Sequence, residues 1–240
     1  MTTPRCGLLF HFTHIDNLPT VLDAGALLSD SAVCAGEFLR HEAADPAIKQ
    51  RRRTCQVMCG QQGVVADYVP FYFAARSPMM YKLWMGGVPS FTGDHRDLVY
   101  FVTDVGSVLE AGLPFAISDR NAAVAIADFT TDVAVLGDLT TPSPQSQFVD
   151  WPLMNAQWWS DTPDDPDRME RRMAEFLVHD RAPLEAMLGI ATYSEAQKVT
   201  VERLLEVAGR SVRVETRPVG TTPRKGARHD PGCTWQPPDR

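Results

Sequence analysis

The apolar residues of this chain come in short runs, and each run ends at polar or turn-forming residues. The clearest runs are Gly7–Thr13, Leu98–Thr103 and Ala174–Val178. Short runs rich in aromatic and β-branched residues are typical of strands. Between them, Leu18–Gly25 and Glu195–Gly209 place their apolar residues at helical spacing. This alternation of short strands and short helices predicts a single α+β domain.

Several weaker patterns complete this expected layout. Strands are predicted at Phe115–Ser118, Gly189–Tyr193 and, along one edge, Ser211–Thr216, and helices at Asp104–Gly112 and Asn121–Asp128. The aromatic segment Val64–Ala75 also predicts a strand. Because proline cannot donate to a strand ladder, Pro70 indicates an edge strand or one that begins at Phe71.

Two long stretches, Ala35–Gly63 and Phe129–Asp165, show little periodicity and are expected to be loops. Residues Leu27–Asp30 are expected to form the start of the loop that leads to the first stretch. The first is predicted to carry a short helix near Ala47–Gln50. Long loops without a function are uncommon, and loops held on a rigid sheet often build a cleft. Residues 217–240 are rich in Pro, Gly and Arg and are predicted to be a disordered tail, so the domain spans 1–216.

Composition excludes several classes of protein. The chain has 240 residues, of which 44% are hydrophobic, enough for one domain with a core. No apolar run reaches the roughly 20 residues of a membrane helix, and no signal peptide is visible, so we expect a cytoplasmic protein. The five scattered cysteines predict neither a disulfide framework nor a zinc site, and no metal is expected. The net charge of −7 implies that any contact with DNA uses a local basic patch.

One carboxylate inside an apolar strand is the most informative single residue. Glu175 follows Ala174, and strand alternation places Glu175 and Leu177 on one face with Phe176 and Val178 on the other. Moving an unpaired carboxylate from water into the protein interior costs free energy on the order of several kcal/mol. Glu175 is therefore either an acid at a cleft wall or the partner of Arg171 or Arg172.

Three further features could carry chemistry, each beside a plainer reading. His14 could hydrogen-bond a ribose or an amide, or it could cap the following helix. The run Arg51–Arg53 could bind a diphosphate, or it could be a solvated turn. The aromatic segment Asp67–Met79 could stack on a flat ring, or it could be core. The stretch Phe129–Asp165 adds a fourth feature, its tryptophans. Trp151, Trp158 and Trp159 could stack on bases, or they could pack the loop.

Four motifs occur in an order that resembles the DarT family of DNA ADP-ribosyltransferase toxins, which work with the macrodomain antitoxin DarG. They are Phe12-Thr13-His14-Ile15-Asp16-Asn17-Leu18, Ile48-x-x-Arg51-Arg52, Asp67–Met79, and a last segment from Trp158 to Glu175 that contains Asp164-Asp165-Pro166 and Arg171-Arg172. The resemblance covers roughly residues 8–215. The last two motifs are long and unusual, so chance explains them poorly.

The resemblance implies a PARP-like ADP-ribosyltransferase fold, with a curved split β-sheet, short helices, two long functional loops and NAD⁺ as co-substrate in the cleft. It places the catalytic residues at Glu175 and, within the arginine run, at Arg52. The residues that it assigns to NAD⁺ are Thr13, His14, Ile15, Asp16, Asp23, Gly25 and Arg51. The resemblance also implies that the loop ending at Glu175 reads the substrate, and we call it the substrate loop. In it, Trp158 and Trp159 would stack on bases, and Arg168 and Arg171 would contact phosphates.

The implied activity is transfer of ADP-ribose from NAD⁺ to thymidine in single-stranded DNA, with guanosine, RNA or protein as alternative acceptors. Many ADP-ribosyltransferases have Gln or Glu two residues before the catalytic Glu, where this chain has Met173. That difference favours a nucleobase acceptor over a protein. A non-catalytic nucleotide-binding module is the alternative from another class. The expected partners are single-stranded DNA and a macrodomain antitoxin, and we expect a monomer without membrane contact.

Overall fold

The computed structural model describes residues 7–36, 46–91, 93–141 and 144–217. Within these ranges the strands are β1 (Leu8–His14), β2 (Ala26–Leu28), β3 (Tyr68–Tyr72), β4 (Leu98–Asp104), β5 (Phe115–Ser118), β6 (Phe129–Thr130), β7 (Glu175–His179), β8 (Arg181–Pro183), β9 (Gly189–Thr192) and β10 (Val214–Thr216). The helices are α1 (Leu18–Ala24), α2 (Asp30–Gly36), α3 (Pro46–Arg52), α4 (Pro78–Trp84), α5 (Val105–Glu110), α6 (Trp151–Met154), α7 (Arg168–Arg171) and α8 (Glu195–Val207). Short 3₁₀ turns are η1 (Ile15–Asn17), η2 (Val65–Asp67), η3 (His95–Asp97), η4 (Val133–Leu136) and η5 (Leu184–Ala186). The predicted mixture of short strands and short helices is confirmed.

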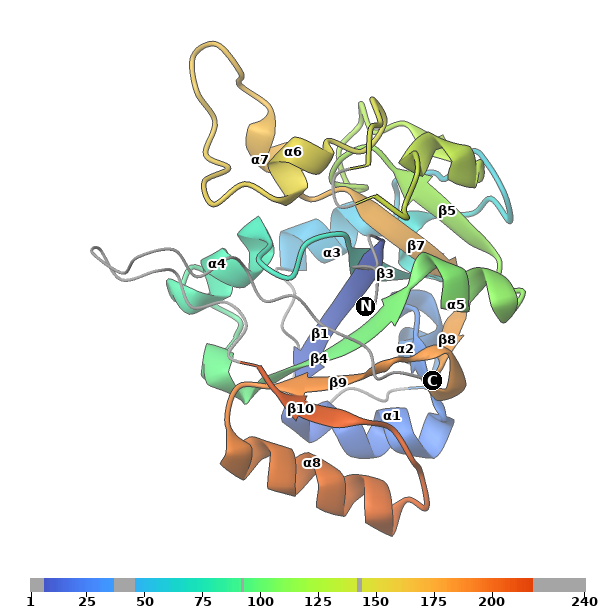
Figure 1. Cartoon of the computed structure of the whole chain (residues 1–240), viewed down its shortest axis with the longest axis vertical. Coiled ribbons are helices and arrows are strands. Elements are labelled where there is room, and N and C mark those ends of the chain that lie inside the picture. Colours follow the sequence, from blue (N-terminus) through green and yellow to red (C-terminus); the bar gives the residue numbers. More distant parts are fainter. Residues whose placement is uncertain (1–6, 37–45, 92, 142–143, 218–240) are drawn as a thin grey trace.

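The main sheet is mixed and opens in its middle. In the described residues it has eight strands in the order β10-β9-β4-β1-β3-β7-β5-β6, while β2 and β8 form a separate pair. Strand β1 pairs with β4 along its whole length, but with β3 only at Phe10↔Tyr72. The sheet therefore divides between β1 and β3 into two halves (Figure 1), which is the split core that the resemblance implies.

Both faces of the central strand β4 are covered, and all seven of its residues are buried. On one face Phe101 packs in a core cluster with residues of α1 and α8. On the other face Tyr100 and Val102 pack with Met80 and Leu83 of α4. Figure 1 shows α1 and α8 together at the β9–β10 end of the sheet, with α6 and α7 beyond β7 at the opposite end. The buried position of Val201 and Leu205 confirms the predicted inner face of α8.

Two expectations about secondary structure and one about Pro70 are wrong for identifiable reasons. The expected loop start at Leu27–Asp30 is instead β2 followed by α2, because β2 finds its partner β8 far along the chain. No helix forms at Asn121–Asp128, since Asn121 Oδ1 accepts the Ala123 N–H and Asp119 Oδ1 accepts the Asp128 N–H. Such local side-chain hydrogen bonds compete with the helical pattern.

Pro70 is neither at a sheet edge nor before the strand, because β3 begins at Tyr68 and lies between β1 and β7. A proline is tolerated there because it lies beyond the one position at which β1 pairs with β3. Its carbonyl oxygen lies 2.8 Å from His11 Nδ1 instead of pairing with the backbone of β1. The split thus explains a residue that the strand pattern alone places wrongly.

Helix α1 ends at the stop signal that the sequence predicted, while β3 and β10 are shorter than predicted. Gly25 stops α1 in the left-handed conformation, with φ of 66°, as its position predicted. Strand β10 lies at the sheet edge. The predicted tail from residue 218 onward and residues 37–45 of the first long stretch lie outside the described residues. In the part that is described, none of the helices has both the length and the apolar character needed to cross a membrane.

Replacing Phe101 by Ala is expected to lower the free energy of unfolding by about 3–5 kcal/mol. The side chain is fully buried where the sheet meets α1 and α8, so truncation leaves a cavity that the two layers cannot close. Urea unfolding followed by circular dichroism measures the change. Val207→Ala, at an 82% exposed position, is the control and should change stability by less than about 0.5 kcal/mol. Equal effects of the two substitutions would contradict this account of the core.

Candidate active site

A cavity lies at the split of the sheet. Its wall combines many apolar groups with a few polar side chains, a composition common in small-molecule sites. The polar members, taken from β1, α1, α2, α3, the turn after β5 and β7, are His11, Thr13, Asn17, Thr20, Asp30, Lys49, Arg52, Asn121 and Glu175. Tyr68, Pro70 and Tyr72 of β3, together with Met79 and Met173, contribute to the rest of the wall. The cavity therefore draws on segments from most of the chain.

The carboxylate of Glu175 is at the centre of the polar groups and is only 1% exposed. Arg52 Nη1 donates to both of its oxygens, at 3.0 Å and 2.8 Å. The backbone N–H of Ala122 donates to Oε1 at 3.1 Å. The partner of Glu175 is thus Arg52, which is distant in sequence, and neither Arg171 nor Arg172. Two charge-assisted bonds to one nitrogen hold the carboxylate in a defined orientation.

Arg52 keeps its charge and one unused donor. Burial alone would lower the pKa of the guanidinium, but Glu175, Tyr72 and Asp30 together outweigh burial and raise the pKa above its ordinary value. Within the described residues, Nη2 of Arg52 is buried without a hydrogen-bond partner. A buried donor of this kind is costly unless a ligand satisfies it. The arrangement is suited to an anionic or oxygen-rich ligand in the cavity.

Asp30 holds the helix that carries Arg52. Its carboxylate binds Lys49 Nζ of α3 at 2.7 Å and, at 2.9 Å, Nε of Arg53, which directly follows the helix. Burial opposes ionisation of Asp30, but these two hydrogen bonds outweigh it and lower the pKa. Arg51 is exposed, and its carbonyl oxygen accepts the Thr54 hydroxyl. Of the three consecutive arginines, Arg52 alone reaches the carboxylate.

The start of β7 is held by a hydroxyl on the neighbouring strand. The backbone N–H of Glu175 donates to Ser118 Oγ at 3.0 Å, and this hydroxyl donates to the Arg120 carbonyl at 2.7 Å. The predicted alternation is confirmed, because Glu175 lines the cavity while Phe176 is in the core, stacked on Phe115. The strand register is therefore what directs the carboxylate into the cavity.

Several lining residues were not recognised in the sequence. Tyr72 lies opposite Glu175 in the strand register, and burial together with that carboxylate raises the pKa of its hydroxyl. Asn17 Nδ2 donates to Thr13 Oγ1 at 3.0 Å. Burial lowers the pKa of His11 to about 4, against an ordinary value of 6.5. His11 could have been found, since it lies two residues before Thr13 in a strand of period two.

Only some of the predicted NAD⁺ contacts line the cavity. Thr13 does, but His14 is buried beside it, where Nδ1 accepts the Asp16 N–H at 3.2 Å and so caps η1. Its ring also meets Phe91 edge to face. The remaining predicted contacts, Ile15, Asp16, Asp23, Gly25 and Arg51, are outside the cavity lining as well. Among the predicted residues, the structure brings together Thr13, Arg52 and Glu175.

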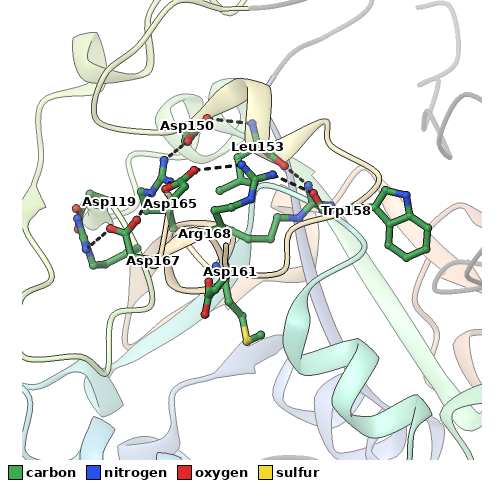
Figure 2. Close-up of polar contacts among 12 residues, drawn as sticks. Asp119, Asp150, Leu153, Trp158, Asp161, Asp165, Asp167 and Arg168 are labelled. Carbon is green, nitrogen blue, oxygen red and sulfur yellow. Dashed lines mark hydrogen bonds and ion pairs between the residues drawn. The ribbon is translucent and has the colours of Figure 1, made fainter. Parts of the chain in front are cut away.

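The predicted substrate loop is held by a network of ion pairs (Figure 2). Arg171 pairs with Asp150, Asp165 and Asp167, and its Nε lies 2.9 Å from Asp167. Arg168 Nη1 binds Asp165 at 3.1 Å, and its Nη2 donates to the Trp158 carbonyl at 3.1 Å. Both guanidinium groups are thus engaged within the loop and would meet a phosphate only by exchanging these partners.

The tryptophans of this loop differ in exposure. Trp158 is 67% exposed, and in Figure 2 its ring points away from the ion-pair network. The ring of Trp159 lies 4.8 Å from Arg172 Cζ, and Arg172 itself is buried. Trp151 is buried in the core, and its Nε1–H donates to the Leu136 carbonyl. Packing therefore accounts for Trp151, while Trp158 is available to a partner.

No group of three or more His, Cys, Asp and Glu side chains suited to a metal occurs in the described part of the chain. The functional groups found at the cavity are two carboxylates, a guanidinium, an ammonium group, an imidazole, amides and hydroxyls. These groups bind sugars and phosphates through hydrogen bonds and charge. The site can therefore hold a nucleotide and place a negative charge against it.

Comparison with known proteins gives concordant matches. The family described as "ssDNA thymidine ADP-ribosyltransferase, DarT" matches residues 10–222. A DNA ADP-ribosyl transferase of Mycobacterium tuberculosis is 35% identical over 209 residues, covering 86% of this chain and 85% of that protein. Thermus sp. 2.9 DarT in complex with ADP-ribosylated ssDNA has a TM-score of 0.78 at 31% identity, covering 91% of this chain and 97% of that one. For Thermus sp. 2.9 DarT in complex with NAD⁺ the TM-score is 0.75 at 30% identity, with 90% and 98% covered.

A double-mutant cycle on Arg52 and Glu175 tests the central ion pair. Arg52→Met is expected to lower the free energy of unfolding by about 3–5 kcal/mol, because it leaves the Glu175 carboxylate buried without its cation. In a Glu175→Gln background the same substitution should cost at least about 1 kcal/mol less. Urea unfolding of the four proteins gives the coupling energy. Arg51→Met is the control and should be nearly neutral, and additive effects at Arg52 and Glu175 would contradict the pair.

The protein is expected to become less stable as pH is lowered, because of His11. The folded state binds a proton there only near pH 4, whereas the unfolded chain does so near 6.5. Stability from this group is therefore complete above pH 6.5 and falls as pH decreases toward 4, with a slope of up to about 1.4 kcal/mol per pH unit. His11→Gln keeps an N–H donor but should have a shallower slope. Chemical unfolding at several pH values measures both, and parallel curves would contradict the buried neutral imidazole.

Proposed function

Because the chain belongs to the DarT family of single-stranded-DNA ADP-ribosyltransferases, we propose that it transfers ADP-ribose from NAD⁺ to a base in single-stranded DNA and releases nicotinamide. The observation that carries this proposal is the buried Glu175 carboxylate, held by Arg52 in a cavity at the sheet split. The names of the relatives and of the NAD⁺ and ADP-ribosylated-DNA complexes support the same reaction.

In the proposed reaction the bond between the nicotinamide nitrogen and ribose C1′ breaks, and its electron pair neutralises the pyridinium ring. The ribose then carries positive charge, as in glycoside cleavage. Glu175 stabilises that charge and binds a ribose hydroxyl, and a preorganised group of this kind supplies roughly 3–4 kcal/mol. A base nitrogen forms the new bond to C1′ and releases its proton to water.

Arg52 has a binding role in this mechanism. Its pKa is raised, so it stays protonated and is unsuited to taking a proton from the acceptor base. The unpartnered Nη2 instead donates to the pyrophosphate or to a ribose oxygen of NAD⁺. Glu175 keeps its orientation through Nη1 while Nη2 serves the ligand.

We propose Thr13 as a direct contact of NAD⁺, since it lines the cavity and its hydroxyl is already bound by Asn17. For His14, Ile15, Asp16, Asp23, Gly25 and Arg51, the proposal is contact with the parts of the dinucleotide that extend beyond the cavity. Their place in the first motif, at the end of α1 and in α3 supports this assignment. His14 would act by fixing the backbone of η1 as well as through its ring.

We propose thymidine as the acceptor base. The family description names thymidine, and Met173 lines the cavity two residues before Glu175, where it offers an apolar surface to a base. Single-stranded DNA presents its bases without the cost of opening a duplex. Exposed Trp158 would stack on a base of that strand, Trp159 would support it, and Arg168 and Arg171 would contact phosphate in exchange for an aspartate.

We also propose that the protein is a monomer that acts in the cytoplasm, where NAD⁺ and DNA occur together. A macrodomain antitoxin of the DarG type is its proposed partner. The family resemblance supports this pairing, because unregulated modification of DNA bases would harm the cell that makes the enzyme.

Glu175→Gln is expected to lower the rate of DNA modification by about 10²–10³ while the fold is preserved, because the substitution removes the charge and keeps the shape. The measurement is mass spectrometry of a pool of single-stranded oligonucleotides after incubation with NAD⁺, which also identifies the modified nucleoside. Glu170→Gln, a carboxylate of α7 outside the cavity lining, is the matched control and should retain activity. If guanosine is the modified nucleoside, the proposed acceptor base is wrong. If RNA or protein offered in place of DNA becomes ADP-ribosylated, the proposed substrate class is wrong. An unchanged rate in Glu175→Gln would refute the mechanism.

A further inference from the structure

Three aromatic side chains form a surface patch beside the cavity. Tyr81 and Trp84 of α4 lie with ring centroids 5.7 Å apart, and Tyr81 meets Trp159 of the substrate loop edge to face at 6.4 Å. Tyr81 is 43% exposed and Trp84 is 38% exposed. We call Tyr81, Trp84 and Trp159 the aromatic patch.

Packing of α4 does not require these exposed rings. The helix is held on the sheet by Met80 and Leu83, which are buried with Tyr100 and Val102 of β4. Tyr81 and Trp84 are three residues apart, so they share another side of the helix. Single exposed apolar residues are ordinary, but aromatic rings gathered from two separate segments indicate a binding surface.

Two residues of the cavity wall lie close in sequence to the patch or to a residue in contact with it. Met79, two residues before Tyr81 in the same helix, lines the cavity. Arg172, whose Cζ lies 4.8 Å from the Trp159 ring centroid, directly precedes the lining residue Met173. In Figure 1 the loop between α6 and α7 projects on the same side of the molecule as α4. A strand that inserts one base into the cavity therefore passes next to the patch.

The charge of this region differs from that of the whole protein. The chain has a net charge of −7, yet residues 68–93 contain no Asp or Glu and hold Arg76 and Lys82. Arg172 adds a third cation, and it donates to the carbonyls of Arg76, Leu153 and Ala156. Cations beside aromatic rings are the usual combination in sites for single-stranded nucleic acid, where bases stack and phosphates are neutralised.

We propose that nucleotides flanking the acceptor base stack on Tyr81 and Trp84, while Arg76 and Lys82 contact the phosphates of the same strand. This inference rests on the proposed function and adds a second contact surface to the predicted substrate loop. Trp159, held by Arg172, joins the two surfaces. A proposed contact of this kind also explains how an acidic protein binds a polyanion. The attraction between cations and DNA phosphates is confined to residues 68–93, which contain no carboxylates.

The test compares a thymidine trinucleotide with an oligonucleotide of about 20 bases, each with saturating NAD⁺. For Tyr81→Ala/Trp84→Ala, the KM of the long substrate is expected to rise about tenfold or more, and kcat to change little. The KM advantage of the long substrate over the trinucleotide should shrink accordingly. Tyr81→Phe/Trp84→Phe keeps the flat rings and should restore the wild-type KM. Leu109→Ala, at a 44% exposed position on α5, is the control for an exposed apolar residue.

The outcomes separate this inference from the proposed function. If the wild-type enzyme modifies neither DNA, the proposed function fails. If it modifies both and the alanine variant keeps the wild-type KM for the long strand, the patch proposal is overturned. An equal loss of kcat on both substrates also overturns it. Should the alanine variant unfold, Lys82→Glu decides: binding of the long strand must weaken and its dependence on salt must decrease, and unchanged binding refutes the proposal.

Discussion

The ion pair between Glu175 and Arg52 is the interaction on which the rest of the site depends. A carboxylate that is 1% exposed would be untenable at the start of a central strand without a cation and a backbone N–H. The pair joins β7 to α3 across the split of the sheet. It therefore fixes the carboxylate for chemistry and also holds α3 against the sheet.

The sheet split and the buried pair require each other. Because β1 and β3 pair at a single position, the space between them is left open for a ligand and for the side chains of α3. Pro70 suits this place, since its missing N–H falls where the strands have separated. Asp30 then binds Lys49 of α3 and Arg53 directly after it, so a second, partly exposed carboxylate supports the buried one. The polar groups of the cavity are thus held by ion pairs and hydrogen bonds between α2, α3 and β7.

Charge in this protein is distributed by region. The substrate loop uses Arg168 and Arg171 to bind its own aspartates, so these cations give the loop shape. The segment of α4, in contrast, has cations and aromatic rings without any acidic residue. A net negative charge is therefore compatible with recognition of DNA, because the local composition and the short range of screened charges decide the binding.

Much of the outline was contained in the sequence. Periodicity located β1, β4, β7 and α8, and the cost of burying a lone carboxylate singled out Glu175 before any partner was known. The motifs indicated the family and the split fold. These inferences succeed because strand and helix periods, caps and desolvation act over a few neighbouring residues.

Only the tertiary structure decided which groups meet. It paired Arg52, which the resemblance had favoured, with Glu175, gave His14 a capping position and placed His11 at the cavity. It also formed β2, whose partner β8 lies far along the chain, and brought Trp159 to Tyr81. Contacts between distant segments depend on how strands pair and layers pack, and local sequence carries no record of that choice.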